Sequence, residues 1–202
     1  MKRLTGYAVI GCALLPACVA CTSGEGGITP SALPSPSSAE PSRLLQLPAL
    51  DLADDPLTEQ DDSAHSGKRR VIGEVHNGLD RIIIYTTGQK CGLATTRKGD
   101  RKNLSVHVLT AWPKDGTHET TRLPYGPYLN SSAKGSHGTW ANLSCGKDAM
   151  VMKFFSPDIS KTSKPRGSLD VIQPQNTESP VSIVVGTREI REKLSAALKT
   201  HS

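Results

Sequence analysis

The chain has 202 residues, of which 36% are hydrophobic and 21% are charged, and its formal net charge is +5 at pH 7. The length is enough for one or two domains, but low-complexity sequence takes up part of it, so we expect a single compact domain. The charge is uneven: four basic and eight acidic residues lie in 1–68 (net −4), against twenty and eleven in 69–202 (net +9). A domain with this positive charge could bind nucleic acid, but the apolar segment at the start of the chain, described next, argues against that class of partner.

The first 20 residues have the pattern of a signal peptide. Residues 1–3 carry two positive charges, and the run Leu4–Val19 is almost wholly apolar or small. Because this run is shorter than the roughly 20 residues of a membrane-spanning helix, and because Pro16 breaks it, we expect cleavage rather than a permanent anchor. Export would take the domain away from nucleic acid, so we expect no nucleic-acid partner.

The end of the leader resembles the lipobox of bacterial lipoproteins. Two registers fit: Leu15-Pro16-Ala17-Cys18, and Cys18-Val19-Ala20-Cys21. The second is followed by a polar stretch typical of a mature amino terminus, so Cys21 is the favoured lipidated residue and Cys18 is the alternative. The resemblance implies a diacylglyceryl thioether on the cysteine sulfur, which would anchor the protein to lipid at the outer face of the cytoplasmic membrane. An ordinary secretory peptide without lipid is the other reading.

Residues 21–68 are predicted to be a disordered linker. Thr29–Ser42 is rich in proline and serine and cannot bury a core, so it should act as an extended spacer. Leu44–Leu52 is an exception, because it is apolar and is followed by an acidic run. It either docks on a partner or packs on the protein's own basic domain, and we favour packing on the domain.

Residues 69–202 are predicted to form a mainly β domain, an antiparallel β-sandwich or barrel-like fold with one C-terminal α-helix. Short runs of β-branched and apolar residues alternate with turn signals. Thr187–Thr200 instead shows apolar residues at helical spacing, which predicts an amphipathic helix packed on the sheet. Leu104, Val106, Val108, Thr110 and Trp112 are expected to share one strand face. The expected strands are Val71–Val75, Arg81–Thr87, Cys91–Arg97, Leu104–Trp112, Glu119–Leu123, Thr139–Cys145, Ala149–Phe155, Ser168–Ile172 and Val181–Val185.

Two cysteines remain in the domain once the leader is set aside. Cys91 and Cys145 form an even pair in a chain expected to enter an oxidising compartment, and such pairs tend to be bridged. We therefore predict a disulfide between them. Two buried free thiols are the alternative.

The sequence gives no positive indication of catalysis. Gly135-Ser136-His137-Gly138-Thr139 resembles the Ser-His-Gly-Cys core of L,D-transpeptidases, which are exported wall enzymes of largely β structure. However, Thr139 stands where that family has its cysteine nucleophile, and Ala141 stands where it has an arginine. Without a reactive thiolate, acyl transfer lacks an activated nucleophile. The histidines show none of the spacings of common metal sites, so we expect no metal, no cofactor and no enzymatic activity.

A binding role has more support from the residues. Rigid aromatic rings that are polar at one end can stack on sugars or on a protein partner, and a basic hairpin tip suits anionic polymers or lipid head groups. We therefore expect a non-catalytic binding or regulatory domain in the cell envelope, similar to small actinobacterial lipoproteins, acting on an envelope polymer or a membrane protein. A wall-modifying enzyme and a sensor or inhibitor of a membrane signalling protein are the alternatives. The candidate binding residues are Trp112, Tyr125, Tyr128 and Trp140 among the aromatics, and Arg97, Lys98, Arg101 and Lys102 at the basic tip.

Overall fold

The computed structural model describes residues 42–57, 68–98, 100–114, 116, 123–158, 164–176 and 178–200. The expected signal peptide, with Cys18 and Cys21, and the Pro/Ser-rich spacer up to Pro41 lie outside these residues.

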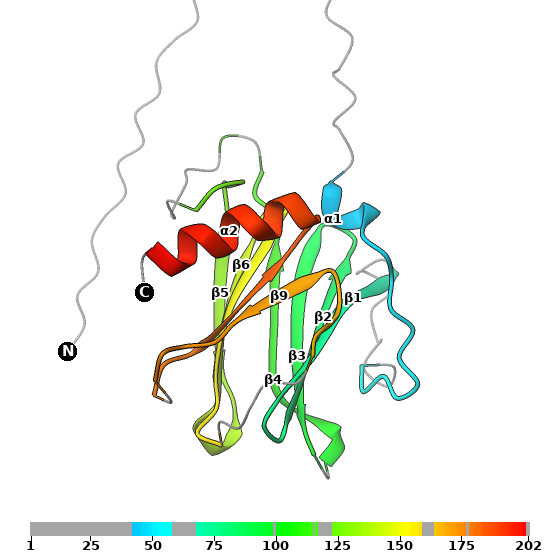
Figure 1. Ribbon diagram of the computed structural model, residues 1–202. Helices are drawn as coiled ribbons and strands as arrows, with labels where there is room; N and C mark the ends of the chain where they lie inside the picture. The colour runs from blue at the N-terminus through cyan, green and yellow to red at the C-terminus, as the bar shows by residue number, and fades with distance from the viewer. Residues whose placement is uncertain are drawn as a thin grey trace, which may run out of the picture. The chain divides into compact units, whose positions relative to one another are not determined.

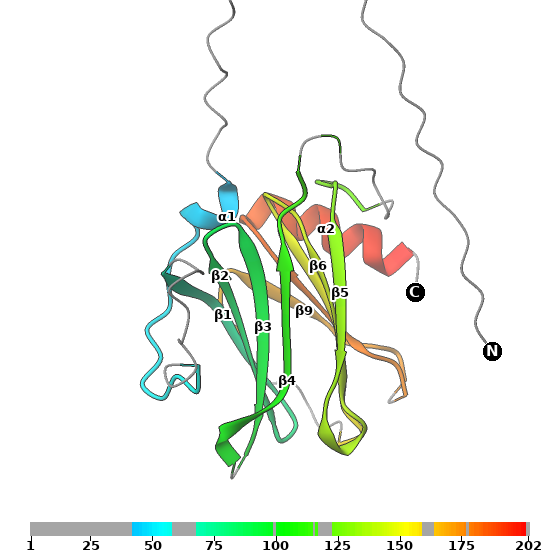
Figure 2. The same ribbon diagram turned by 180° about the vertical axis from the view of Figure 1, so that it is seen from behind.

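Two five-stranded antiparallel sheets face each other and form a β-sandwich (Figures 1 and 2). The order in sheet A is β4(Asp100–Ala111), β3(Lys90–Arg97), β2(Asp80–Thr87), β1(Arg69–Asn77) and β8(Arg166–Gly167). The order in sheet B is β5(Leu129–Lys134), β6(Trp140–Cys145), β7(Met150–Phe155), β10(Val181–Val185) and β9(Leu169–Ile172).

The predicted fold class is confirmed, but two strands are missing from the prediction, β5 and the two-residue β8. Strand β5 has the sequence Leu-Asn-Ser-Ser-Ala-Lys, which contains no β-branched or aromatic residue and so carries no local strand signal. It is a strand because it pairs along its whole length with β6, from Leu129 opposite Cys145 to Lys134 opposite Trp140. The strand predicted at Glu119–Leu123 falls mainly outside the described residues, and Leu123 itself is not in a strand.

The main core lies between the two sheets and follows the two-residue period of the strands. Val106 and Val108 of β4 face inward, as do Met150, Met152 and Phe154 of β7. Half-buried Trp112 packs against the same core.

Leu104 breaks the predicted pattern of β4. Thr95 pairs with Val106 but the next residue, Thr96, pairs with Leu104, so one residue of β4 is left without an opposite. This bulge reverses the side-chain alternation, because an extra residue shifts a strand by half its period. Leu104 therefore packs on the outer face of sheet A, and its predicted place beside Val106 and Val108 is wrong.

The predicted disulfide is present between Cys91 of β3 and Cys145 of β6. Their Cα atoms are 5.7 Å apart, and both residues are fully buried. The bond joins sheet A to sheet B through the middle of the core. It also fixes the end of β6, and this strand carries Asn142 and Ser144 on the face of sheet B that points away from the core.

Helix α2(Arg188–Thr200) covers one end of the outer face of sheet B, as the helical spacing predicts. Ile190 and Leu194 are fully buried there. They join a second apolar cluster with Tyr128, Val151 and Val184. The rest of this face of sheet B is left uncovered by the helix (Figure 1).

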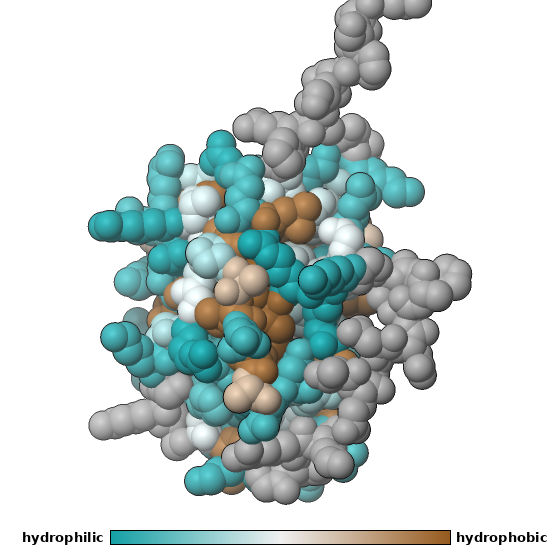
Figure 3. Space-filling view, turned by 90° about the vertical axis from the view of Figure 1, so that its right-hand side faces the viewer, coloured by the Kyte–Doolittle hydropathy of each residue, from teal (hydrophilic) through white to brown (hydrophobic). Residues whose placement is uncertain are grey.

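The folded unit begins before residue 69, because residues 42–57 (the N-terminal segment) pack on it, as expected for the apolar run Leu44–Leu52. A short helix, α1(Arg43–Gln46), places Leu44 in the main core with no exposed surface. Further along, Leu57 is buried in a third apolar cluster on the outer face of sheet A. Hydrophobic residues gather at the centre of this side of the domain, with hydrophilic residues around them (Figure 3).

Three arginines of sheet A hold the N-terminal segment in place. Arg69 forms an ion pair with Asp55 at 2.7 Å and also donates to the carbonyl of Leu57. Arg70 donates to the carbonyls of Leu45 and Leu47, and Arg81 to that of Asp54. The segment is therefore an integral part of the domain, and the expectation of a disordered linker does not apply to residues 42–57.

Candidate binding groove

A polar face on sheet B offers the best-formed site in the described part of the chain. In β5 the side chains alternate in exposure, so that Asn130, Ser132 and Lys134 all point away from the core. In β6 the outward residues are Trp140, Asn142 and Ser144, because Ala141, Leu143 and Cys145 belong to the core. The antiparallel register places these two sets directly opposite each other.

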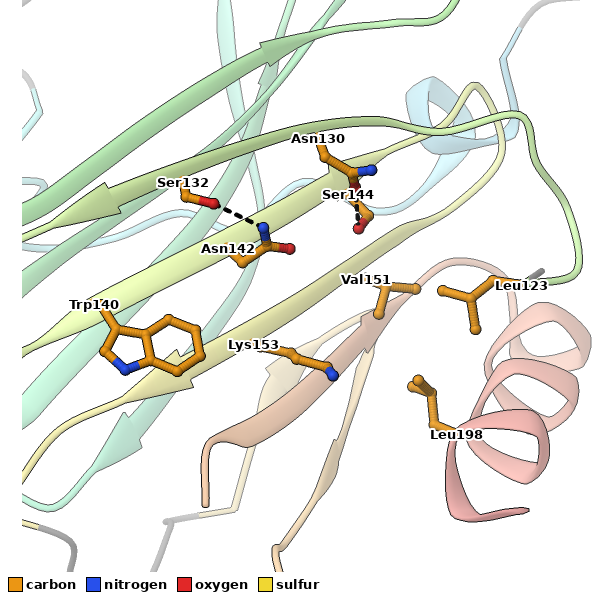
Figure 4. Close-up of a pocket in the computed structure, with 9 residues that line it drawn as sticks. All are labelled: Leu123, Asn130, Ser132, Trp140, Asn142, Ser144, Val151, Lys153 and Leu198. Atoms are coloured by element: carbon orange, nitrogen blue, oxygen red, sulfur yellow. Dashed lines mark hydrogen bonds between the residues drawn. The ribbon is translucent and has the colours of Figure 1, made fainter. Parts of the chain in front are cut away.

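All of these side chains except that of Lys134 line a groove of about 630 Å³ on the outer face of sheet B (Figure 4). We call it the β6 groove. Val151, Leu123 and Leu198 gather at one end, where helix α2 covers the sheet, and Trp140 lies at the other end (Figure 4). Asn142 and Lys153 lie between the two ends. The groove is therefore apolar at one end, polar in the middle and aromatic at the other end.

Two cross-strand hydrogen bonds organise the polar floor of the β6 groove. The Asn142 amide nitrogen donates to the Ser132 hydroxyl at 2.8 Å, and the Ser144 hydroxyl donates to the Asn130 amide oxygen at 2.5 Å. An amide nitrogen carries two hydrogens, so Asn142 keeps one donor and its carbonyl oxygen for another partner. The oxygen of Asn142 points away from Ser132 (Figure 4).

Trp140 forms the aromatic end of the groove. Its ring stacks on Phe155 of β7, with centroids 6.1 Å apart and an angle of 18° between the planes. Trp140 stays half-exposed. Together with Ser132 it also lines a smaller cavity of about 270 Å³ that reaches Lys134. The hollowed surface therefore continues along β5 and β6 beyond the main groove.

The described lining combines neutral polar, aromatic and positively charged side chains. Asn and Ser supply neutral hydrogen-bond donors and acceptors, Trp140 supplies a ring face, and Lys153 and Lys134 supply positive charge. The described residues of the two cavities include no carboxylate and no histidine.

The segment that resembles the L,D-transpeptidase core is the turn between β5 and β6. Ser136–Gly138 forms a single 3₁₀ turn. The Thr139 hydroxyl is buried and donates to the carbonyl of Ser136 at 2.7 Å. This hydroxyl is therefore part of the turn's own hydrogen bonding, while His137 is exposed.

The structure separates the predicted aromatic residues. Tyr128 is fully buried under helix α2, where its hydroxyl donates to the carbonyl of Pro124, so no ligand can stack on it and its predicted binding role is wrong. Trp112 packs against the main core. Tyr125 lines a different cavity of about 350 Å³, with the Lys193 amine 5.8 Å from its ring centre. Trp140 alone of the four predicted aromatics lines the β6 groove.

The predicted basic tip is the turn between β3 and β4. Arg97 forms an ion pair with Asp158, so part of its charge is neutralised. Lys98 is exposed, and its backbone amide donates to the carbonyl of Leu79. Arg101 and Lys102 are in β4, but their side chains lie outside the described part of the structure. Asp158 therefore makes the tip less basic than the sequence predicts.

No protein-family model matches the chain, and no curated protein and no solved structure matches it either. The described residues contain no group of three or more His, Cys, Asp or Glu side chains arranged to hold a metal ion. They also contain no helix with the length and apolar character needed to cross a membrane.

Sequence reasoning missed the polar members of the groove. Asn130, Ser132 and Lys153 are single polar residues in short strands, where each is ordinarily read as a solvated outward position. Their significance depends on register, since three strands must align before the side chains converge. The alternation of outward and core residues in β6 and β7 did indicate which side chains point outward. Because β5 was not predicted, the residues opposite those of β6 could not be assigned.

A titratable pair lies on the outer face of sheet A, away from the groove. The Tyr85 hydroxyl and His107 Nε2 are 2.5 Å apart. Partial desolvation on the sheet lowers the pKa of His107 from its usual 6.5, and the positive charge of Arg69 lowers it further. The His107 ring therefore binds its second proton more weakly in the folded protein than in the unfolded chain.

We expect this difference to reduce stability as pH falls. Below pH 6.5 the unfolded chain gains a proton on His107 before the folded protein does, and this favours unfolding until the folded pKa is also passed. Between about pH 7 and about pH 5, the free energy of unfolding measured in urea should fall less for His107→Gln than for the wild type. The difference should be small because the ring is exposed. Equal losses in the two proteins would contradict the assignment.

Proposed function

We propose that this protein is a membrane-tethered, non-catalytic domain that binds a component of the cell envelope through the β6 groove. The observation that carries the proposal is the groove itself: an open cavity of about 630 Å³ with a stacked tryptophan and two fixed Asn–Ser pairs. Binding sites in general combine an apolar surface with a few polar groups that fix orientation.

The tether supports the envelope as the place of action. A lipidated Cys21 followed by about 20 residues of Pro/Ser-rich spacer would hold the domain within reach of the membrane and of the wall above it. The N-terminal segment begins beside the β6–β7 turn, where Ser42 donates to the carbonyl of Lys147, and its later residues pack on the outer face of sheet A (Figure 2).

Two variants separate the anchor from the groove. In cells that produce the protein, Cys21→Ala should release it from the membrane fraction, while the released protein still binds purified envelope. Trp140→Ala should do the opposite, staying at the membrane but binding envelope at least about tenfold more weakly in a sedimentation assay. Cys18→Ala serves as the matched control for the first variant, and it becomes the informative one if the other register is used.

The lipid anchor and the β6 groove can be rejected independently of each other. Membrane association that survives both cysteine variants would remove the anchor from the proposal. Envelope binding that is unchanged by Trp140→Ala would remove the groove. Trp140→Phe keeps a ring on the same strand, and it should retain more binding than Trp140→Ala if stacking is what matters.

A further inference from the structure

We infer that the ligand of the β6 groove is an acidic polysaccharide, with one sugar ring stacked on Trp140 and its negative groups near Lys153 and Lys134. This inference rests on the proposed function, since it names the ligand class of the same site. It is drawn from three features of the described residues: the aromatic end, the polar floor and the sign of the charge.

The aromatic end suits the face of a sugar ring. An aromatic ring is negative on its face, so it attracts the weakly positive C–H groups on one side of a pyranose. Phe155 stacks against one side of Trp140 and limits its movement, which reduces the entropy lost when a ligand binds. Half-exposed Trp140 lines both cavities, so a ring bound there can continue into a chain on either side.

The polar floor suits hydroxyl groups in a row. Asn142 and Ser132 form one pair, and Asn130 and Ser144 form the next, two positions along each strand. The Asn142 amide offers a donor and an acceptor at a fixed place, and a sugar hydroxyl needs both. From Trp140 to Ser144 the strand rises about 13 Å, which is longer than one monosaccharide ring, so the site fits a chain.

The charge of the site favours an acidic chain over a neutral one. Lys153 of β7 is exposed and lies directly opposite Asn142 in the middle of the groove. Lys134 is exposed at the edge of the smaller cavity. Among the described residues that line the two cavities, no acidic side chain offsets these charges. A carboxylate or phosphate on the sugar chain would therefore meet positive charge without repulsion.

The first test uses the full-length chain in detergent and envelope purified from the cells that produce it. Portions of the envelope are treated with protease, which removes proteins, or with periodate, which opens sugar rings that bear adjacent hydroxyls. We expect protease-treated envelope to bind as before and periodate-treated envelope to bind at least about tenfold more weakly. Carboxyl reduction and phosphate removal, applied separately, identify which acidic group contributes.

The second test uses charge variants of the same chain. Asn142→Asp changes the amide to a carboxylate of nearly equal size, and it should weaken envelope binding at low salt more than at high salt. Lys153→Ala should weaken binding a few-fold and reduce its salt dependence. Lys90→Ala is the matched control, because it removes an equal charge from an exposed position on sheet A and should change neither quantity.

Each outcome decides a different statement. If protease abolishes binding and periodate does not, the ligand is a protein, and the saccharide inference is overturned while the proposed function stands. If carboxyl reduction and phosphate removal both leave binding intact, the acidic part is overturned. If untreated envelope does not bind at all, the proposed function fails as well.

Discussion

Removing the Cys91–Cys145 disulfide is expected to lower the free energy of unfolding by about 4 kcal/mol. The bond joins residues 54 positions apart, so it excludes many extended states of the unfolded chain, and the chain-entropy account gives this magnitude for such a loop. Urea unfolding of the chain from Thr22 onward measures it cleanly, since that chain contains no cysteine besides this pair. The wild type should be compared with its reduced form and with the Cys91→Ala/Cys145→Ala variant.

The two forms without the bond separate its effect from that of the sulfur atoms. Both cysteines are fully buried, so the alanine variant also loses packed volume and should be somewhat less stable than the reduced wild type. A reduced protein as stable as the oxidised one would contradict the expectation. The effect bears on the groove because Cys145 follows Ser144 directly, and β6 is the strand that carries the groove's centre.

Replacing Leu44 with alanine should cost about 2–5 kcal/mol of unfolding free energy, although this residue lies far outside the domain that the sequence predicts. Leu44 has no exposed surface and packs in the core between the sheets, so the change leaves a cavity there. The neighbouring contacts make collapse of that cavity difficult. Ser42 donates to the carbonyl of Lys147, and the amide of Arg43 donates to Asp148 at 3.2 Å.

Leu45→Ala is the matched control for this prediction. Leu45 is the next residue in the same short helix, but 41% of its surface is exposed, so its loss should change stability by less than about 0.5 kcal/mol. Equal effects of the two substitutions would mean that the N-terminal segment does not pack as described. A chain that begins at Arg69 should likewise be much less stable than one that begins at Ser42.

In the proposed function, these contacts would resist a force applied to the domain through the tether. A pull on the chain at Ser42 is resisted first by the contacts of the N-terminal segment with Lys147 and Asp148, and by Leu44 in the core. Lys147 and Asp148 lie in the turn between β6 and β7. The start of the N-terminal segment is thus connected to the sheet that carries the β6 groove.

The sequence by itself determined the features that depend on local pattern. Alternating apolar residues predicted β2, β3, β4, β6, β7 and β10 to within a few residues, and helical spacing at Ile190 and Leu194 predicted α2. The disulfide followed from counting cysteines in a chain expected to be exported. The strand and helix predictions are confirmed because one buried face imposes a two-residue period on a strand and a 3.6-residue period on a helix. That period can be recognised from neighbouring residues alone.

Only the tertiary structure decided the candidate binding surface. Strand β5 exists because β6 pairs with it, and the bulge near Ser105 turns Leu104 to the other face of its sheet. Tyr128 and Trp140 look alike in the sequence, but α2 buries the first, while the second stays half-exposed on the sheet. The β6 groove needs three strands in register, the end of a helix and the loop that carries Leu123. Pairing, register and burial depend on residues far apart in the chain, so local pattern cannot specify them.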